Sequence, residues 1–331
     1  MRANSRCPLP LLTALSIAFT VCIPPAQARP ALSVDVDTGT VVAAHDKDRS
    51  WHPASVTKLM TAAVALEAVR AGKLTLRTPI AFSKNAASIP PSKLGLKAGA
   101  SIPLGDALRI MLTRSMNDVA VAIAETTAGS EASFARLMNL KAASLGMRGT
   151  RFVNASGLHD PEQVSTAADL AILARHILLE FPESAPLFGI PSVTYAGRTL
   201  RNTNGLVGRY AGVQGMKTGY VCASGFNLVG LASRGSRRIL TVVLGAPNAR
   251  TREKETALLF DTAFASPTSG PKLTSGSSFP VPAIDLRTKG CGKNLGENFK
   301  IEPGGGSPTP LPVIKPSREW TIAGDLEDYG G

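Results

Sequence analysis

Apolar residues in this chain follow a strand period near both ends and a helix period between them. From residue 31 to residue 45 they alternate with polar residues on either side of an Asp37-Thr38-Gly39 turn, which predicts a β-hairpin. The stretch from Ser55 to Gly72 is instead apolar on almost every side. This pattern predicts a helix that is buried in the core.

The middle of the chain has the spacing of apolar residues that is typical of helices. Gly129 and Gly146 end two of these stretches, and Thr166 with Asp169 resembles a capping box that opens another. After residue 190 the pattern changes to short runs of strand character. Helices are therefore predicted near 104–113, 117–128, 131–145, 166–180 and 251–265, and strands over 195–200, 212–220, 226–232 and 239–246.

Strands at both ends of residues 29–265, with helices between them, predict one α+β domain whose middle is an inserted helical lobe. Pro, Gly, Ser and Thr dominate residues 266–331. We therefore expect a flexible tail there, with at most a few short strands. The tail contains no long apolar or amphipathic run, so no clear membrane anchor is predicted.

The first 28 residues have the pattern of a secretory signal peptide. Arg2 and Arg6 precede a mostly apolar stretch, and Ala26-Gln27-Ala28 fits a cleavage site. We therefore expect an exported protein, either periplasmic or secreted. The formal net charge of +12 suits an anionic partner such as a cell-wall polymer. Export, and the lack of a basic stripe interleaved with aromatic residues, argue against nucleic acid.

Cysteine and histidine usage limits the chemistry further. Only Cys222 and Cys291 remain once the leader is removed. A disulfide between them is possible in an oxidising compartment, but spacing alone leaves its formation open. The four histidines have no ligand-like spacing, so we predict no metal site and no other cofactor.

Ser55-Val56-Thr57-Lys58, at the start of the buried helix, is the first candidate for catalysis. Its spacing puts the serine hydroxyl and the lysine amine on one helix face. A serine needs a base to become a nucleophile, and burial can lower the pKa of a lysine enough for that role. The alternative is a capping serine followed by a solvated lysine. A second Ser-x-x-Lys, at Ser269, shows that chance also supplies the pattern.

Two further short motifs follow in order along the chain. In Ser115-Met116-Asn117, between two predicted helices, the Ser115 hydroxyl can relay a proton and the Asn117 amide can hold a substrate carbonyl. Lys217-Thr218-Gly219 falls on a predicted strand, whose edge can pair with an extended peptide. There Lys217 supplies positive charge, Thr218 a hydroxyl for a carboxylate, and Gly219 room for the substrate backbone. Each motif alone also fits an ordinary cap or turn, whereas the three in this order indicate one site.

The three motifs resemble those of penicillin-binding proteins and class A β-lactamases, with Ser-Met-Asn in place of Ser-Asp-Asn. The segments 51–61, 202–206 and 215–220 are similar to low-molecular-mass penicillin-binding proteins, the D-alanyl-D-alanine carboxypeptidase family. The resemblance covers about residues 30–265. It implies a β-lactamase/transpeptidase-like fold, with an antiparallel sheet flanked by helices. The tail resembles neither the β-rich second domain nor the membrane-binding helix of many family members.

The resemblance also implies a role for each site residue. Ser55 is the expected acylated nucleophile, with Lys58 as its base and Ser115 in proton transfer. The expected substrate-binding residues are Asn117, Lys217, Thr218, Gly219, Tyr220 through its backbone N–H, and Arg252 for the terminal carboxylate. The implied reaction removes the terminal D-alanine from peptidoglycan stem peptides. β-Lactams mimic that dipeptide and are the expected inhibitors.

Three other functions stay open at this point. A D,D-endopeptidase that cuts peptidoglycan cross-links uses the same residues. A class A β-lactamase needs a deacylating glutamate, and Glu162 lies in the corresponding region without the surrounding pattern. A catalytically silent penicillin-binding or wall-binding protein is the non-enzymatic alternative, and the intact motifs argue against it.

Overall fold

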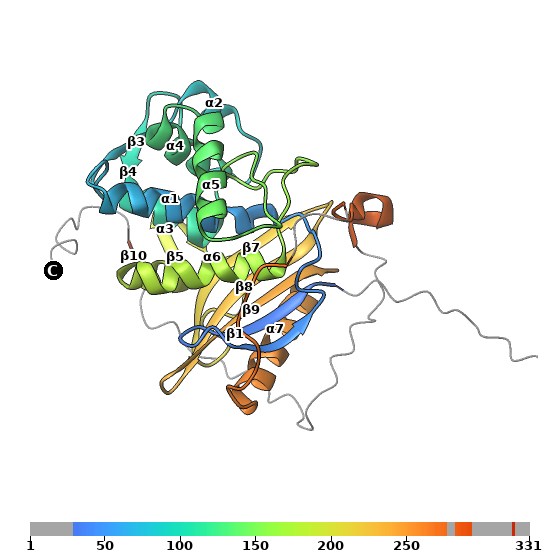
Figure 1. Ribbon diagram of the computed structural model, residues 1–331. Coiled ribbons are helices and arrows are strands. Elements are labelled where there is room, and N and C mark those ends of the chain that lie inside the picture. Colours follow the sequence, from blue (N-terminus) through green and yellow to red (C-terminus); the bar gives the residue numbers. More distant parts are fainter. Residues whose placement is uncertain (1–28, 277–281, 293–319, 322–331) are drawn as a thin grey trace, which may run out of the picture.

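The computed structural model describes residues 29–276, 282–292 and 320–321, and its core is an antiparallel sheet with helices on both faces (Figure 1). The predicted signal peptide, residues 1–28, and most of the predicted tail lie outside the described residues. No helix in the described part of the chain is long and apolar enough to cross a membrane.

Five strands form the central sheet in the order β2-β1-β9-β8-β7, and all neighbouring pairs are antiparallel. β1 lies between β2 and β9, so the N-terminal hairpin joins the strands from the end of the domain. β8 and β9 are buried along most of their length, because helices cover both faces of the sheet. The strands are β1 (Ala31–Asp35), β2 (Val41–His45), β7 (Val213–Val221), β8 (Gly225–Arg234) and β9 (Arg237–Ala246).

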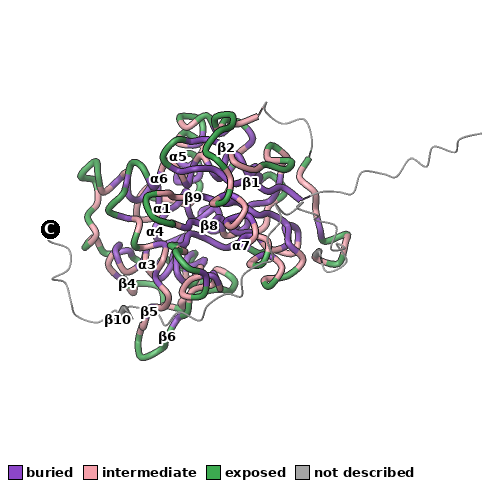
Figure 2. The backbone as a smooth tube through the Cα atoms, turned by 90° about the horizontal axis from the view of Figure 1, so that it is seen from below, coloured by how far each residue is buried: buried purple, intermediate pink, exposed green. Residues whose placement is uncertain are grey.

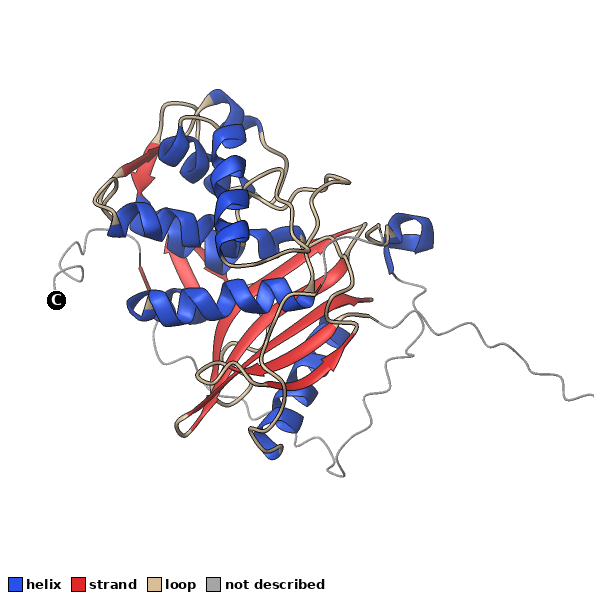
Figure 3. Ribbon diagram, in the orientation of Figure 1, coloured by secondary structure: helices blue, strands red, loops and turns tan. Residues whose placement is uncertain are grey.

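Two helices cover the sheet, one on each side (Figure 3). α7 (Ala249–Ala265) packs on β8 and β9, and α6 (Ala167–Glu180) packs on β9 and β1 from the opposite side. α1 (Lys58–Arg70) lies between α6 and the helical lobe, and it contacts both. Ten of its thirteen residues are buried, which confirms the prediction of a buried helix.

The helical lobe, at the top of Figure 1, is built from the middle of the chain. It has the position predicted for it, between the first and the last strands of the sheet. The main core runs from the sheet through α1 into this lobe. Figure 2 shows the buried parts of the backbone gathered at the centre of the molecule. The lobe consists of α2 (Lys84–Ser88), α3 (Leu104–Arg114), α4 (Asn117–Ala128), α5 (Glu131–Ser144) and the hairpin of β3 (Pro79–Ala81) with β4 (Ser101–Pro103).

The predicted single strand over 195–200 is wrong. The chain forms a hairpin there, β5 (Ser192–Tyr195) and β6 (Arg198–Arg201), and β5 also pairs with β10 (Trp320–Thr321). The turn places Ala196 at a φ of +47° and Gly197 at +73°. Alanine rarely adopts a left-handed conformation, so the pattern of residues did not reveal the turn.

Two described segments beyond residue 265 are joined to the domain. In the first, the backbone N–H of Val41 donates to Pro271 O and that of Leu273 to Gly39 O, both at 2.8 Å. In the second, Cys291, within the 3₁₀ helix η3 (Leu286–Gly292), forms a disulfide with Cys222. The disulfide that the sequence left open is therefore present. The boundary at residue 265 and the flexibility of the tail remain predictions.

Candidate active site

Ser55 lies in a single 3₁₀ turn, η1 (Ala54–Thr57), directly before α1. The residue before it, Ala54, has a φ of +49°. This left-handed conformation is strained for any residue that has a Cβ, and strained residues of this kind cluster at functional sites. β7 passes close to this turn. A Cβ on Gly219 would lie 3.0 Å from Ser55 N, so the glycine permits the close approach of strand and turn.

Lys58 is completely buried and directs its amine back to Ser55. Its Nζ donates to Ser55 Oγ at 3.0 Å, to Asn117 Oδ1 at 2.8 Å and to the carbonyl oxygen of Ser156. Burial, with the nearby charge of Lys217, holds the pKa of Lys58 well below its usual value, against the opposing effect of Asp118. A lowered pKa increases the neutral fraction of the amine, and a neutral amine can accept a proton from the hydroxyl beside it.

The second motif lies at the junction of α3 and α4. Ser115 ends α3 in a left-handed conformation, with a φ of +68°, and Asn117 begins α4 with its carbonyl oxygen toward Lys58. Asp118 is fully buried and accepts the backbone N–H groups of residues 94 and 95, which ties a loop of the lobe to this junction. The Ser115 hydroxyl makes no hydrogen bond to a described residue, and its connection to the site is that it lies two residues before Asn117, which contacts Lys58.

The third motif lies on β7, at the edge of the sheet. Lys217 is buried and donates to Thr218 O at 2.9 Å. Burial and the nearby charge of Arg252 lower the pKa of Lys217 to about 7. The hydroxyl of Thr218 lies 2.6 Å from that of Thr203, and Arg252 Nη2 donates to Thr203 O at 3.3 Å. Arg252, predicted from the resemblance alone, thus lies beside the Lys217-Thr218 segment.

One feature of Arg252, which lies in α7 beside this strand, suits an anionic ligand. The buried Nε of Arg252 has no hydrogen-bond partner among the described residues. An unpaired guanidinium donor beside a threonine hydroxyl can bind a carboxylate. Tyr220, at the far end of the motif, is 45% exposed and stacks on Phe226 with ring centroids 4.3 Å apart. Its ring is therefore partly exposed at the surface.

The loop that contains Ser156 was not among the predicted site residues. Asn154 Oδ1 accepts the backbone N–H of Gly157 at 2.7 Å, which shapes a tight turn. Gly157 has a φ of +83°, and a Cβ there would lie 1.9 Å from Ala54 O. An Asn-x-x-Gly segment is a turn signal. It does not tell which side chain the turn will meet, so the contact with Lys58 needed the fold.

Asn227, on β8, was also missed, although it anchors the segment before Ser55. Its Nδ2 donates to His52 O and Pro53 O at 3.0 and 3.2 Å, and its Oδ1 accepts Gly245 N at 2.9 Å. We expect Asn227→Ala to lower the free energy of unfolding by about 2–3 kcal/mol, because buried backbone groups lose their partners. Urea denaturation measures this loss.

The control is Asn85→Ala, which removes a single exposed hydrogen bond to Glu125. It should change the free energy of unfolding by no more than about 0.5 kcal/mol. An equal loss of unfolding free energy in the two variants would show that the hydrogen bonds of Asn227 do not stabilise the segment before Ser55.

The fold and the site define a class: transpeptidase/β-lactamase-fold proteins with a Ser-x-x-Lys pair facing a Lys-Thr-Gly strand. The family model described as D-alanyl-D-alanine carboxypeptidase, peptidase family S11, matches residues 17–248. The chain therefore belongs to the D-alanyl-D-alanine carboxypeptidase family.

Individual relatives agree with this assignment. The chain is 34% identical over 247 residues to the D-alanyl-D-alanine carboxypeptidase DacD of Escherichia coli (strain K12), which covers 72% of this chain and 64% of that protein. This chain thus spans less than two thirds of that relative.

Solved structures agree on the fold. The structure of D-alanyl-D-alanine carboxypeptidase DacD from Francisella tularensis is similar with a TM-score of 0.69 and 28% identity, covering 80% of this chain and 74% of that one. Penicillin-binding protein D2 from Listeria monocytogenes, in its ampicillin-bound form, is similar with a TM-score of 0.66 and 33% identity, covering 72% and 97%.

Proposed function

We propose that this protein is an exported serine-type D-alanyl-D-alanine carboxypeptidase, which removes the terminal D-alanine from peptidoglycan stem peptides. One observation carries the proposal: the amine of Lys58, a residue with 0% of its surface exposed, donates to Ser55 Oγ at 3.0 Å. A neutral lysine in this position can take the proton of the hydroxyl as it attacks.

The reaction has two steps that share these residues. Ser55 Oγ attacks the carbonyl carbon of the terminal peptide bond while Lys58 accepts its proton. The proton passes through Ser115 to the leaving nitrogen, D-alanine departs, and an ester on Ser55 remains. Water then attacks the ester and releases the shortened peptide. The backbone N–H groups of Ser55 and Tyr220 hold the oxyanion, a contribution of about a hundred- to a thousandfold in rate per donor.

Substrate binding uses the strand and the lobe. The stem peptide extends along the edge of β7, where backbone hydrogen bonds give affinity. Its terminal carboxylate meets Thr218 and the unpaired donor of Arg252, and Lys217 adds positive charge. Asn117 holds the amide of the substrate from the opposite side. β-Lactams acylate the same serine; the similar penicillin-binding protein D2 from Listeria monocytogenes, solved in its ampicillin-bound form, supports this part of the proposal.

The β-lactamase alternative has less support than the carboxypeptidase. The Glu162 side chain is 63% exposed and forms an ion pair with Arg151 at 3.3 Å. A deacylating glutamate has to activate a water beside the ester. The D,D-endopeptidase alternative uses the same residues, and only its substrate, a cross-linked peptide, distinguishes it from the carboxypeptidase. The intact hydrogen-bond network of Lys58 argues against a silent binding protein.

Intact-protein mass spectrometry after incubation with benzylpenicillin tests the proposal. We expect one stable penicilloyl adduct on the wild-type protein and none on Ser55→Ala. Release of D-alanine from a stem pentapeptide, with no cleavage of a cross-linked dimer, then identifies the carboxypeptidase. Rapid conversion to penicilloic acid would instead establish a β-lactamase. If the protein gains no adduct and the penicillin is not hydrolysed, the catalytically silent alternative is the one that remains.

A further inference from the structure

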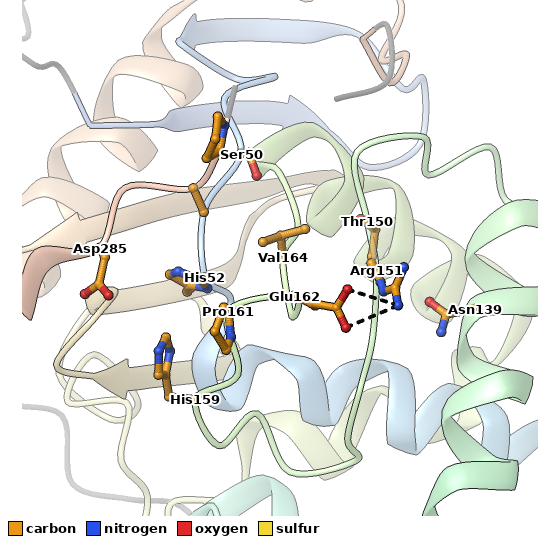
Figure 4. A pocket seen from close by; sticks show the side chains of 12 residues that line it. Ser50, His52, Asn139, Thr150, Arg151, His159, Pro161, Glu162, Val164 and Asp285 are labelled. Carbon is orange, nitrogen blue, oxygen red and sulfur yellow. Dashed lines mark hydrogen bonds and ion pairs between the residues drawn. The ribbon is translucent and has the colours of Figure 1, made fainter. Parts of the chain in front are cut away.

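A cavity of about 800 Å³ lies beside the segment that leads into Ser55 (Figure 4). Four parts of the chain form its walls: residues 50–52, Asn139 of α5, the loop 150–164, and the first residues of the strap, which we define as residues 282–292. His52, His159 and Asp285 lie toward one side of the cavity, and the ion pair of Arg151 with Glu162 lies toward the other.

The strap is fixed to the end of β7. The disulfide between Cys222 and Cys291 joins it to the chain two residues beyond Tyr220. Leu286 N donates to Ala223 O at 2.9 Å, and the Leu286 side chain is 1% exposed in the main core. The strap therefore holds its wall of the cavity in a fixed position relative to β7.

His159 has hydrogen-bonding capacity that no described residue uses. Its ring meets His52 edge to face, with centroids 5.0 Å apart, and both of its ring nitrogens are buried without a partner. Burial, together with His52, lowers the pKa of His159, so the ring is neutral near pH 7. A neutral imidazole has one donor and one acceptor, and burying both unpaired is costly. A peptide group supplies the complementary acceptor and donor.

The rest of the lining suits a peptide as well. Pro161, Val164, Pro282 and Ala283 give apolar walls, and Ser50 and Thr150 add hydroxyl groups. The charges at the margins are paired, because Asp285 accepts Arg287 Nε at 2.8 Å and Glu162 binds Arg151. A cavity that is neutral overall favours a polypeptide backbone over a highly charged ligand.

The direction of the substrate leads toward this cavity. In the proposed function the terminal carboxylate lies at Thr218 and Arg252, and the scissile carbonyl lies between Ser55 and Tyr220. The remainder of the peptide then continues past Tyr220 toward Cys222, where the strap is attached. The loop that carries His159 also adjoins the Ser55 turn, because Gly157 packs against Ala54 O.

We propose that the cavity between the strap and His159 is a subsite for the part of the stem peptide on the amino-terminal side of the scissile bond. This inference rests on the proposed function and adds a determinant of substrate length to it. The strap, through the disulfide, holds one wall of the subsite, and His159 hydrogen-bonds to the peptide backbone.

Steady-state kinetics with two substrates test the subsite. One is a stem pentapeptide and the other is N-acetyl-D-Ala-D-Ala, which is too short to reach the cavity. In His159→Ala and in the double variant Cys222→Ser/Cys291→Ser, the ratio of kcat/KM for the long over the short substrate should fall about tenfold, as for one lost buried hydrogen bond. His45→Ala, at an exposed histidine of β2 that does not line the cavity, is the matched control.

Ala283→Phe fills the cavity without touching the disulfide, and it should lower the same ratio even where the double variant does not fold. A ratio that stays at the wild-type value in Ala283→Phe and His159→Ala would overturn the inference. So would a wild-type enzyme that does not prefer the long substrate. A wild-type protein that releases D-alanine from neither substrate would overturn the proposed function itself, and the subsite with it.

Discussion

Replacing Lys58 with arginine should slow the acylation of Ser55 by benzylpenicillin about a hundred- to ten-thousandfold, the usual contribution of a positioned general base. Arginine keeps the positive charge of lysine, but it does not give up its proton at accessible pH. The variant therefore separates proton acceptance from electrostatic stabilisation. Lys84→Arg, at an exposed position, should acylate like the wild type.

The pH dependence of acylation should change in the same variant. Because the pKa of Lys58 is lowered, the neutral amine becomes the main form as pH rises through that pKa. The wild-type rate should therefore rise with pH over this window and then level off, while Lys58→Arg should lack the rise. Rapid-quench kinetics across pH measures both curves. If Lys58→Arg acylates within about tenfold of the wild type with an unchanged profile, Lys58 is not the base.

Gly157→Ala should lower the free energy of unfolding by about 3 kcal/mol, combining a left-handed alanine with a backbone clash. The Cβ would lie 1.9 Å from Ala54 O, so either the loop or the turn that carries Ser55 has to move. Acylation should fall as well, by roughly a hundredfold, because displacement of a reacting group by about 1 Å costs that much. Urea denaturation and penicillin acylation measure the two effects.

Gly129→Ala is the matched control, because Gly129 has a φ of +77° but nothing within 4 Å of its Cβ position. Gly129→Ala should lower the free energy of unfolding only by the cost of a left-handed alanine, about 1 kcal/mol, and should leave acylation unchanged. Equal losses of stability in the two variants would mean that the contact of residue 157 with Ala54 does not matter.

Long, strongly patterned elements were predictable from the sequence, because their signals are local. α1 is apolar on nearly all sides and α4 ends at Gly129. β7, β8 and β9 are runs of strand character, and turns separate each from the next. The lobe elements α2, β3 and β4 are three to five residues long, too short to show a period.

The site divides in the same way. The Ser55–Lys58 contact follows from helix geometry, so spacing alone predicted it. The acceptor role of Ser156 comes from a backbone carbonyl, which every residue type offers, and Asn227 lies far from Ser55 in sequence. The pairing of Cys222 with Cys291 likewise depends on the path of the chain in space. The catalytic and binding roles of the site residues stay predictions.

β7 is an outer strand of its sheet, and within the described residues it pairs along one side only, with β8. Long unpaired strand edges promote aggregation, because they can extend a sheet from one molecule into the next. In this fold the first half of β7 lies against η2 (Pro182–Gly189), where Gly189 and Gly215 allow the two backbones to approach closely. The η1 turn lies against the second half at Gly219. A strand from another molecule would have to avoid or displace these two packed segments to pair along β7, which lowers the tendency of this edge to extend the sheet.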